Sequence, residues 1–137
     1  MSTFRATFEN LRSRTGMYVR EPTYASVSAL VIGYDLACEG GVLAGFREWL
    51  IPRVDTGNNL AWPELVLRVA FPDAVDPREA VRASSVTERH AIDTLFGLVG
   101  EFDDLRSKSG LKQIFHDYEL WLSRQDWYTE GSPGRNR

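Results

Sequence analysis

The chain has 137 residues, of which 43% are hydrophobic and 12% aromatic, and its formal net charge is −3. This length fits one domain whose core removes roughly two-thirds of the unfolded surface from water. The negative charge disfavours a nucleic-acid partner, and the single Cys38 excludes an internal disulfide. No apolar run reaches the roughly 20 residues of a membrane helix, and the first residues lack a signal-peptide core, so we expect a cytoplasmic protein without a membrane partner.

Apolar residues at steps of three and four predict two helices near the N-terminus. The first is expected to run from Ser2 to Thr15-Gly16 and to end through a left-handed glycine, with an extended connection over residues 17–22. The second is expected over residues 23–39. This second segment is apolar on most sides, which predicts a central helix and a buried, inert Cys38.

The middle of the chain predicts two shorter helices. A third helix is expected over residues 42–51, where apolar residues again follow a helical spacing. Asn58 or Asn59 is expected to cap a fourth helix, because a side-chain oxygen at that position accepts from free backbone amides. Residues 65–71 are also compatible with a strand, but helix is favoured because no second strand candidate offers a partner.

Two capping signals precede the C-terminal helices. Asp76-Pro77-Arg78-Glu79 has an acceptor at the cap, proline at the first position and glutamate three residues on. Residues 85–88 repeat this pattern before a long helix expected over residues 86–108. Gly110 separates that helix from a last one, and the short connection predicts that the two fold back on each other as an antiparallel pair.

The sequence therefore predicts an all-α fold, a compact bundle of about five helices ending in an antiparallel helical hairpin. A single domain is expected over residues 1–128. Residues 129–137 read Thr-Glu-Gly-Ser-Pro-Gly-Arg-Asn-Arg and are expected to form a disordered C-terminal tail.

The two histidines are the first candidates for metal chemistry. His90 is followed by Asp93 and His116 by Glu119, and such pairs on facing helices can build a bundle metal site. In an antiparallel pair, however, the two histidines would lie on the order of 16 Å apart along the helices. No metal site, cofactor or catalytic residue is therefore predicted, and no nucleophile elbow, phosphate-binding loop or dinucleotide fingerprint occurs.

One short element resembles a known family. Residues 14–19, Arg-Thr-Gly-Met-Tyr-Val, resemble the Arg-Pro-Gly-Met-Tyr-Ile-Gly element of type II topoisomerase ATPase domains. In that family the next helix supplies an asparagine for magnesium and a glutamate as base, whereas residues 30–36 here read Leu-Val-Ile-Gly-Tyr-Asp-Leu. Residues 55–57, Asp-Thr-Gly, also lack the rest of an ATP-binding loop, so the sequence does not support an ATPase.

A longer resemblance is to a group of small uncharacterised bacterial proteins. They combine an Arg-Pro-Gly-Met-Tyr element, a Gly-Tyr pair in the next helix and a Phe-x-x-Trp-Leu further on. This chain has residues 14–18, Gly33-Tyr34 and Phe46-Arg47-Glu48-Trp49-Leu50, with Thr15 and Arg20 replacing a proline and a second glycine. The resemblance implies an accessory of a bacterial toxin or conflict system, including the immunity proteins.

Two functional hypotheses follow. The first is a non-enzymatic module that binds a protein partner such as a toxin, with an acidic C-terminal half suited to a basic toxin. Its candidate binding residues are polar and aromatic groups expected on two loops, namely Arg14, Tyr18, Arg20, Asn58, Asn59 and Trp62.

The alternative is a small enzyme or ligand-binding protein with a pocket between the second, third and fourth helices. Its convergent polar groups are expected to come from five residues, namely Tyr34, Asp35, Arg47, Glu48 and Trp62. An enzyme is expected to show a deep pocket with converging charges, and a binding module to expose an apolar or charged patch.

Overall fold

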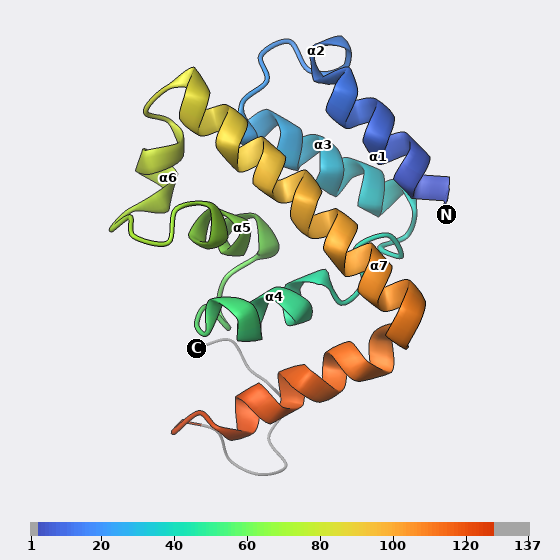
Figure 1. Cartoon of the computed structure of the whole chain (residues 1–137), viewed down its shortest axis with the longest axis vertical. Helices are drawn as coiled ribbons and strands as arrows, with labels where there is room; N and C mark the ends of the chain where they lie inside the picture. The colour runs from blue at the N-terminus through green and yellow to red at the C-terminus, as the bar shows by residue number, and fades with distance from the viewer. Residues whose placement is uncertain (1–2, 128–137) are drawn as a thin grey trace.

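A computed structural model of the chain describes residues 3–127, and every regular element in that range is helical (Figure 1). The helices are α1 (Thr3–Ser13), α2 (Thr15–Tyr18), α3 (Tyr24–Ala37), α4 (Phe46–Val54), α5 (Trp62–Ala70), α6 (Pro77–Val81) and α7 (Ser85–Ser123). The predicted all-α bundle is confirmed, with seven helices in the described range. The tail predicted over residues 129–137 lies outside that range.

The first half of α7 forms the centre of the fold. It contacts α1, α3, α4, α5 and α6, which surround it in Figure 1. Its inward residues, among them Ile92, Leu95 and Phe102, are fully buried. Each such side chain stabilises the fold by roughly 1.5–3 kcal/mol through removal of its apolar surface from water.

The N-terminal connection is helical where an extended segment was predicted. α1 ends at Ser13, and α2 forms one further turn that includes Gly16 and Tyr18. The buried Thr15 explains the difference, because its hydroxyl donates to the carbonyl oxygens of Leu11 and Arg12, both at 3.0 Å. Gly16 is therefore not a left-handed cap, and the direction of the chain changes before it.

α3 is peripheral, although its apolar sequence predicted a central helix. Thr23 and Ser26 form the capping box that starts it. Val27 and Val31 are fully buried on the side that faces α7, but the opposite side is exposed, and so is Cys38. A helix that is apolar on most sides carries no pattern that tells which side the fold covers, and here only one side is covered.

α4 and α5 occupy the predicted region with shifted ends. α4 begins after Gly45, whose φ of 89° is left-handed, and continues through Pro52 to Val54. Residues 65–70 lie in α5, which confirms helix over strand for most of that stretch. The cap of α5 is Ala61 and not Asn58 or Asn59, because the Asn58 side chain is buried against Tyr118 of α7.

The two predicted capping signals differ in their outcome. Asp76 caps α6 as predicted, accepting from the amides of Arg78 and Glu79 at 3.1 and 3.4 Å. The cap of α7 is Ser84, one residue earlier than predicted, and its reciprocal partner is Thr87.

The predicted helical hairpin is replaced by a V. Gly110 (φ 79°, ψ 169°) interrupts the helical backbone of α7, and Figure 1 shows the second half leaving at a wide angle to the first. The second half does not fold back along the first because it packs on α4 and the loop after it. There Trp121 Nε1 donates to Asp55 Oδ1 at 2.8 Å. The sequence predicted the break at Gly110 but not the partner that sets its angle.

Candidate functional site

The six candidate binding residues fall into two groups that the fold keeps apart. Arg14, Tyr18 and Arg20 belong to α2 and the residues on either side of it, whereas Asn58 and Asn59 lie in the α4–α5 connection and Trp62 is the first residue of α5. Figure 1 shows α2 at the top of the molecule and the α4–α5 connection well away from it, on the far side of the first half of α7. The six residues therefore do not form one site.

The group at the α4–α5 connection makes contacts mainly within the chain. Asn58 is buried, and its side-chain oxygen accepts from the Tyr118 hydroxyl at 2.5 Å. Arg47 donates to the backbone carbonyl of Asn58 and to that of Leu60, the latter at 2.7 Å. Trp62 packs edge-on against Phe46, with ring centroids 5.7 Å apart, and Asn59 is exposed. These contacts hold the connection against α4 and α7.

The group at α2 lies beside a shallow groove with a volume of about 390 Å³. Residues of α1, α2 and the start of α7 line this groove, namely Arg12, Ser13, Arg14, Thr15, Gly16, Met17, Pro22 and Arg89. Three of these eight residues are arginines and none is acidic. The groove therefore offers positive charge to whatever enters it.

Two large side chains stand out from the same region. Met17 is 75% exposed and Tyr18 is 49% exposed. The Tyr18 hydroxyl accepts from Asn10 Nδ2 at 2.7 Å, which fixes the direction of the ring, and Arg89 pairs with Asp93 at 3.3 Å. We call this region the α2 surface and define it as Arg12, Arg14, Met17, Tyr18, Arg20 and Arg89.

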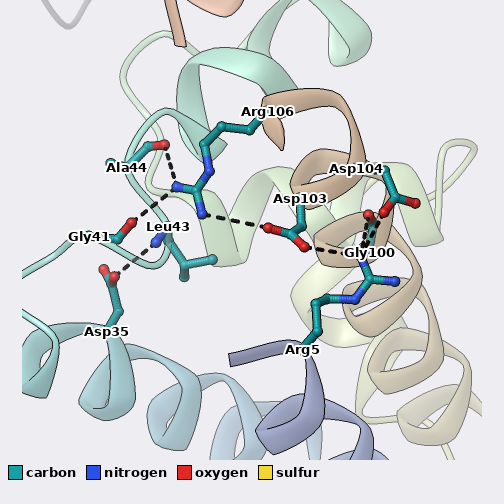
Figure 2. Close-up of polar contacts among 9 residues, drawn as sticks. All are labelled: Arg5, Asp35, Gly41, Leu43, Ala44, Gly100, Asp103, Asp104 and Arg106. Carbon is teal, nitrogen blue, oxygen red and sulfur yellow. Dashed lines mark hydrogen bonds and ion pairs between the residues drawn. The ribbon is translucent and has the colours of Figure 1, made fainter. Parts of the chain in front are cut away.

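The acidic side chains of the C-terminal half are in part neutralised within the fold. Figure 2 shows the main example, in which the buried Asp103 lies between two arginines. Arg5 Nη1 is 3.2 Å from Asp103 and 3.0 Å from Asp104, and Arg106 Nη2 is 3.8 Å from Asp103. Burial alone would lower the pKa of Arg5, but the hydrogen bonds to both carboxylates raise it above its ordinary value.

The same cluster holds the segment between α3 and α4. Arg106 donates to the carbonyl oxygens of Gly41 and Ala44, and Asp35 accepts from the amide of Leu43 at 2.9 Å (Figure 2). The contacts drawn in Figure 2 thus join α1 and this segment to α7, and α3 to this segment. The chemistry of the cluster is that of a structural clamp.

The five residues of the enzyme alternative do not converge. Asp35 caps the amide of Leu43 in the clamp, and Tyr34 packs against Phe8 with ring centroids 5.7 Å apart. Arg47 and Glu48 pair with each other at 3.4 Å beside the α4–α5 connection. None of these residues lines the α2 groove or either of the two other grooves described below.

Groups with shifted pKa values serve packing. Burial, and secondarily the charge of Glu64, raises the pKa of Tyr24, whose hydroxyl donates to the Pro63 carbonyl at 2.7 Å. Burial likewise raises the pKa of Tyr118, although the hydrogen bond with Arg47 offsets part of this increase. The hydroxyls of Tyr24 and Tyr118 each join α5, or the connection before it, to another helix.

The histidines lie in separate environments. His90 Nε2 is 2.8 Å from the Ala70 carbonyl, and its ring packs edge-on against Phe71, whereas His116 is exposed on the second half of α7. Within residues 3–127 no group of three or more histidine, cysteine or acidic side chains is placed to hold a metal ion. No helix in the described part of the chain combines the length and apolar content needed to cross a membrane.

A groove between α4, α5 and α6 has a volume of about 350 Å³ and is lined in part by Arg53 and Arg68.

Comparison with protein-family models, with characterised proteins and with solved structures gives no match for this chain. The α2 surface is the region where candidate residues from the sequence meet exposed apolar groups and a charged groove. The sequence named Arg14, Tyr18 and Arg20 as binding residues, but it did not predict Arg89, because the start of α7 lies beside α2 only in the fold.

Proposed function

We propose that the chain is a non-enzymatic protein-binding module of a bacterial toxin or conflict system. More specifically, we propose that it is an immunity protein that neutralises a toxin. It would act in the cytoplasm on a protein partner that docks on the α2 surface. The observation that carries the proposal is the exposure of Met17 and Tyr18 among arginines that line one groove.

This combination of side chains is the one that protein interfaces use most. Tyrosine, methionine and arginine are enriched in interface cores, and a few large anchors contribute most of the affinity. The hydrogen bond from Asn10 holds the Tyr18 ring in place before binding, which lowers the entropy lost on association.

The charge of the surface specifies the partner. Arg12, Arg14 and Arg89 line the groove without an acidic side chain among the lining residues, so an acidic surface on the partner fits it best. The clamp in Figure 2 supports the same view, because it leaves less free negative charge for a basic partner than the sequence predicted.

The test is binding to the product of the neighbouring gene, measured by isothermal titration calorimetry together with growth rescue on co-expression. Met17→Asp and Arg14→Glu are expected to weaken binding at least about tenfold and to abolish rescue, because each removes an anchor or reverses a charge at the contact. Leu120→Asp and Lys112→Glu are the matched controls on the second half of α7 and should bind as the wild type does.

Three results would overturn the proposal. One is the absence of binding to that gene product. Another is an equal effect of the control variants. The third is salt-sensitive binding to duplex DNA or RNA that Arg14→Glu abolishes, which would make the α2 surface a phosphate-binding surface.

A further inference from the structure

A second exposed surface runs along α3. Ala25, Ala29, Ile32 and Leu36 follow each other at steps of four, three and four, so they form one stripe on the helix. Leu36 is 71% exposed and Ile32 is 38% exposed. We call these four residues the α3 face. It contains no charged side chain.

A groove lies beside the N-terminal half of the α3 face. Its volume is about 350 Å³, and α3, α5 and α6 form its walls. Apolar groups of Tyr24, Pro63, Leu67 and Val81 line it together with the two alanines and Ile32 of the α3 face. Its lining also includes Ser28, Arg82 and the ion pair of Arg78 with Glu64 at 2.7 Å. A leucine side chain presented to the α3 face would therefore contact the apolar part of this lining.

Small and large residues are ordered along the α3 face so that the faces of two copies fit together when the two helices are antiparallel. When two α3 helices pack antiparallel, Leu36 of one copy lies opposite Ala25 of the other, and Ile32 lies opposite Ala29. Each large side chain then meets a small one, which gives the close packing that a stable contact needs. Parallel packing would instead set Leu36 against Leu36 and leave a gap between the alanines.

The charges at the two ends of α3 favour the same arrangement. Arg82 lines the groove near the N-terminal end, and Glu39 is exposed just after the C-terminal end. An antiparallel pair brings Arg82 of each copy toward Glu39 of the other, and it also sets the two helix dipoles in opposite directions. The contact between Arg82 and Glu39 occurs twice because the arrangement has a two-fold axis.

We infer that the α3 face binds a second copy of this chain in an antiparallel, two-fold symmetric dimer, with Leu36 of each copy seated in the groove beside Ala25 of the other. The contact involves one helix and one groove, which is at the low end of interface sizes, so the dimer dissociates on dilution. The inference does not depend on the α2 surface or on the proposed function.

Sedimentation velocity over roughly a thousandfold range of protein concentration tests the dimer. The wild-type chain is expected to shift from monomer to dimer as concentration rises. Leu36→Lys should remain monomeric because it places a positive charge in a groove that Arg78 and Arg82 line, whereas Leu120→Lys, on the second half of α7, should dimerise like the wild type. Circular dichroism melts of both variants establish that they are folded.

Exchanging the large and the small residue tests whether Leu36 of one copy packs against Ala25 of the other. Leu36→Ala alone and Ala25→Leu alone are each expected to weaken the dimer at least about tenfold, the first by leaving a gap and the second by a collision. The double variant restores one large and one small residue at each contact, so its dimerisation should recover. Recovery is specific to the antiparallel register, because a parallel pair would gain nothing from the exchange.

Cross-linking tests the orientation. The two-fold axis passes between residues 29 and 32, so the two Cys38 thiols lie about 22 Å apart and do not cross-link, by the helical rise. Ala29→Cys in a Cys38→Ser background is expected to form a disulfide-linked dimer under mild oxidation. A chain that stays monomeric at every concentration, a Leu36→Lys variant that still dimerises, or efficient cross-linking through Cys38 would overturn the inference.

Discussion

The Tyr118 hydroxyl donates to the side-chain oxygen of Asn58 at 2.5 Å, across 60 positions of sequence. Both residues are buried, and the bond joins the second half of α7 to the connection between α4 and α5. Trp121 repeats the link one helical turn later through its bond to Asp55. These two contacts explain why the chain leaves Gly110 as a V and not as a hairpin.

Tyr118→Phe is expected to destabilise the fold by about 1–2 kcal/mol, because it removes a buried hydrogen bond while keeping the ring. Urea unfolding followed by circular dichroism measures the change. In a double-mutant cycle with Asn58→Ala the two effects should be less than additive, since the variants remove the same bond. Strict additivity would show that the two side chains stabilise the fold independently.

Gly110→Ala is expected to cost about 1–3 kcal/mol, because residues with a Cβ rarely adopt φ 79° with ψ 169°. Gly97→Ala is the matched control on the same helix. Gly97 is exposed, and a Cβ added there meets no atom within 4 Å. Helix propensity alone then predicts a gain of about 0.5–1 kcal/mol. Opposite signs in urea unfolding support the backbone break at Gly110, and a gain in both variants would contradict it.

Asp103→Asn is expected to destabilise the fold by about 3 kcal/mol, because it leaves Arg5 and Arg106 partly buried beside a neutral group. Asp104→Asn is the control. Its side chain is 76% exposed, so the loss should stay below about 1 kcal/mol although the same arginine is involved. Thermal unfolding of both variants distinguishes the buried contact from the exposed one, and equal losses would argue against a clamp centred on Asp103.

The local signals of the sequence were sufficient for the helices but not for their arrangement. The Asp76 cap, the break at Gly110 and the helical character of residues 65–70 each follow from neighbours in sequence, and the structure confirms them. The position of Asn58 could not be predicted from its neighbours in the sequence. An asparagine before a helix favours a cap, but a partner 60 positions away takes its side chain instead.

The candidate site, too, could be predicted only in part from neighbours in the sequence. Arg14 and Tyr18 stood out because they lie within one short element, whereas Arg89 joins them only through the packing of α7 near α2. The exposed side of α3 was also not predictable. Its sequence is apolar nearly all round, and the fold covers it on one side only.

The buried phenol of Tyr24 makes the stability of the fold depend on pH in the alkaline range. Burial raises the pKa of Tyr24 above its ordinary value, so the folded chain keeps this phenol neutral where an unfolded chain begins to ionise, near pH 10. Above that pH the unfolded state binds fewer protons than the folded one, and the free energy of unfolding must therefore fall as pH rises. Below it the contribution is fully present.

Urea midpoints between about pH 8 and about pH 11 measure this decline. Tyr24→Phe should be less stable at the lower pH, because the hydrogen bond to the Pro63 carbonyl is lost, yet its midpoint should fall less steeply with pH. The two effects have different origins and separate cleanly in one titration series. Parallel curves for the wild type and the variant would show that Tyr24 ionises in the folded chain as readily as in the unfolded one.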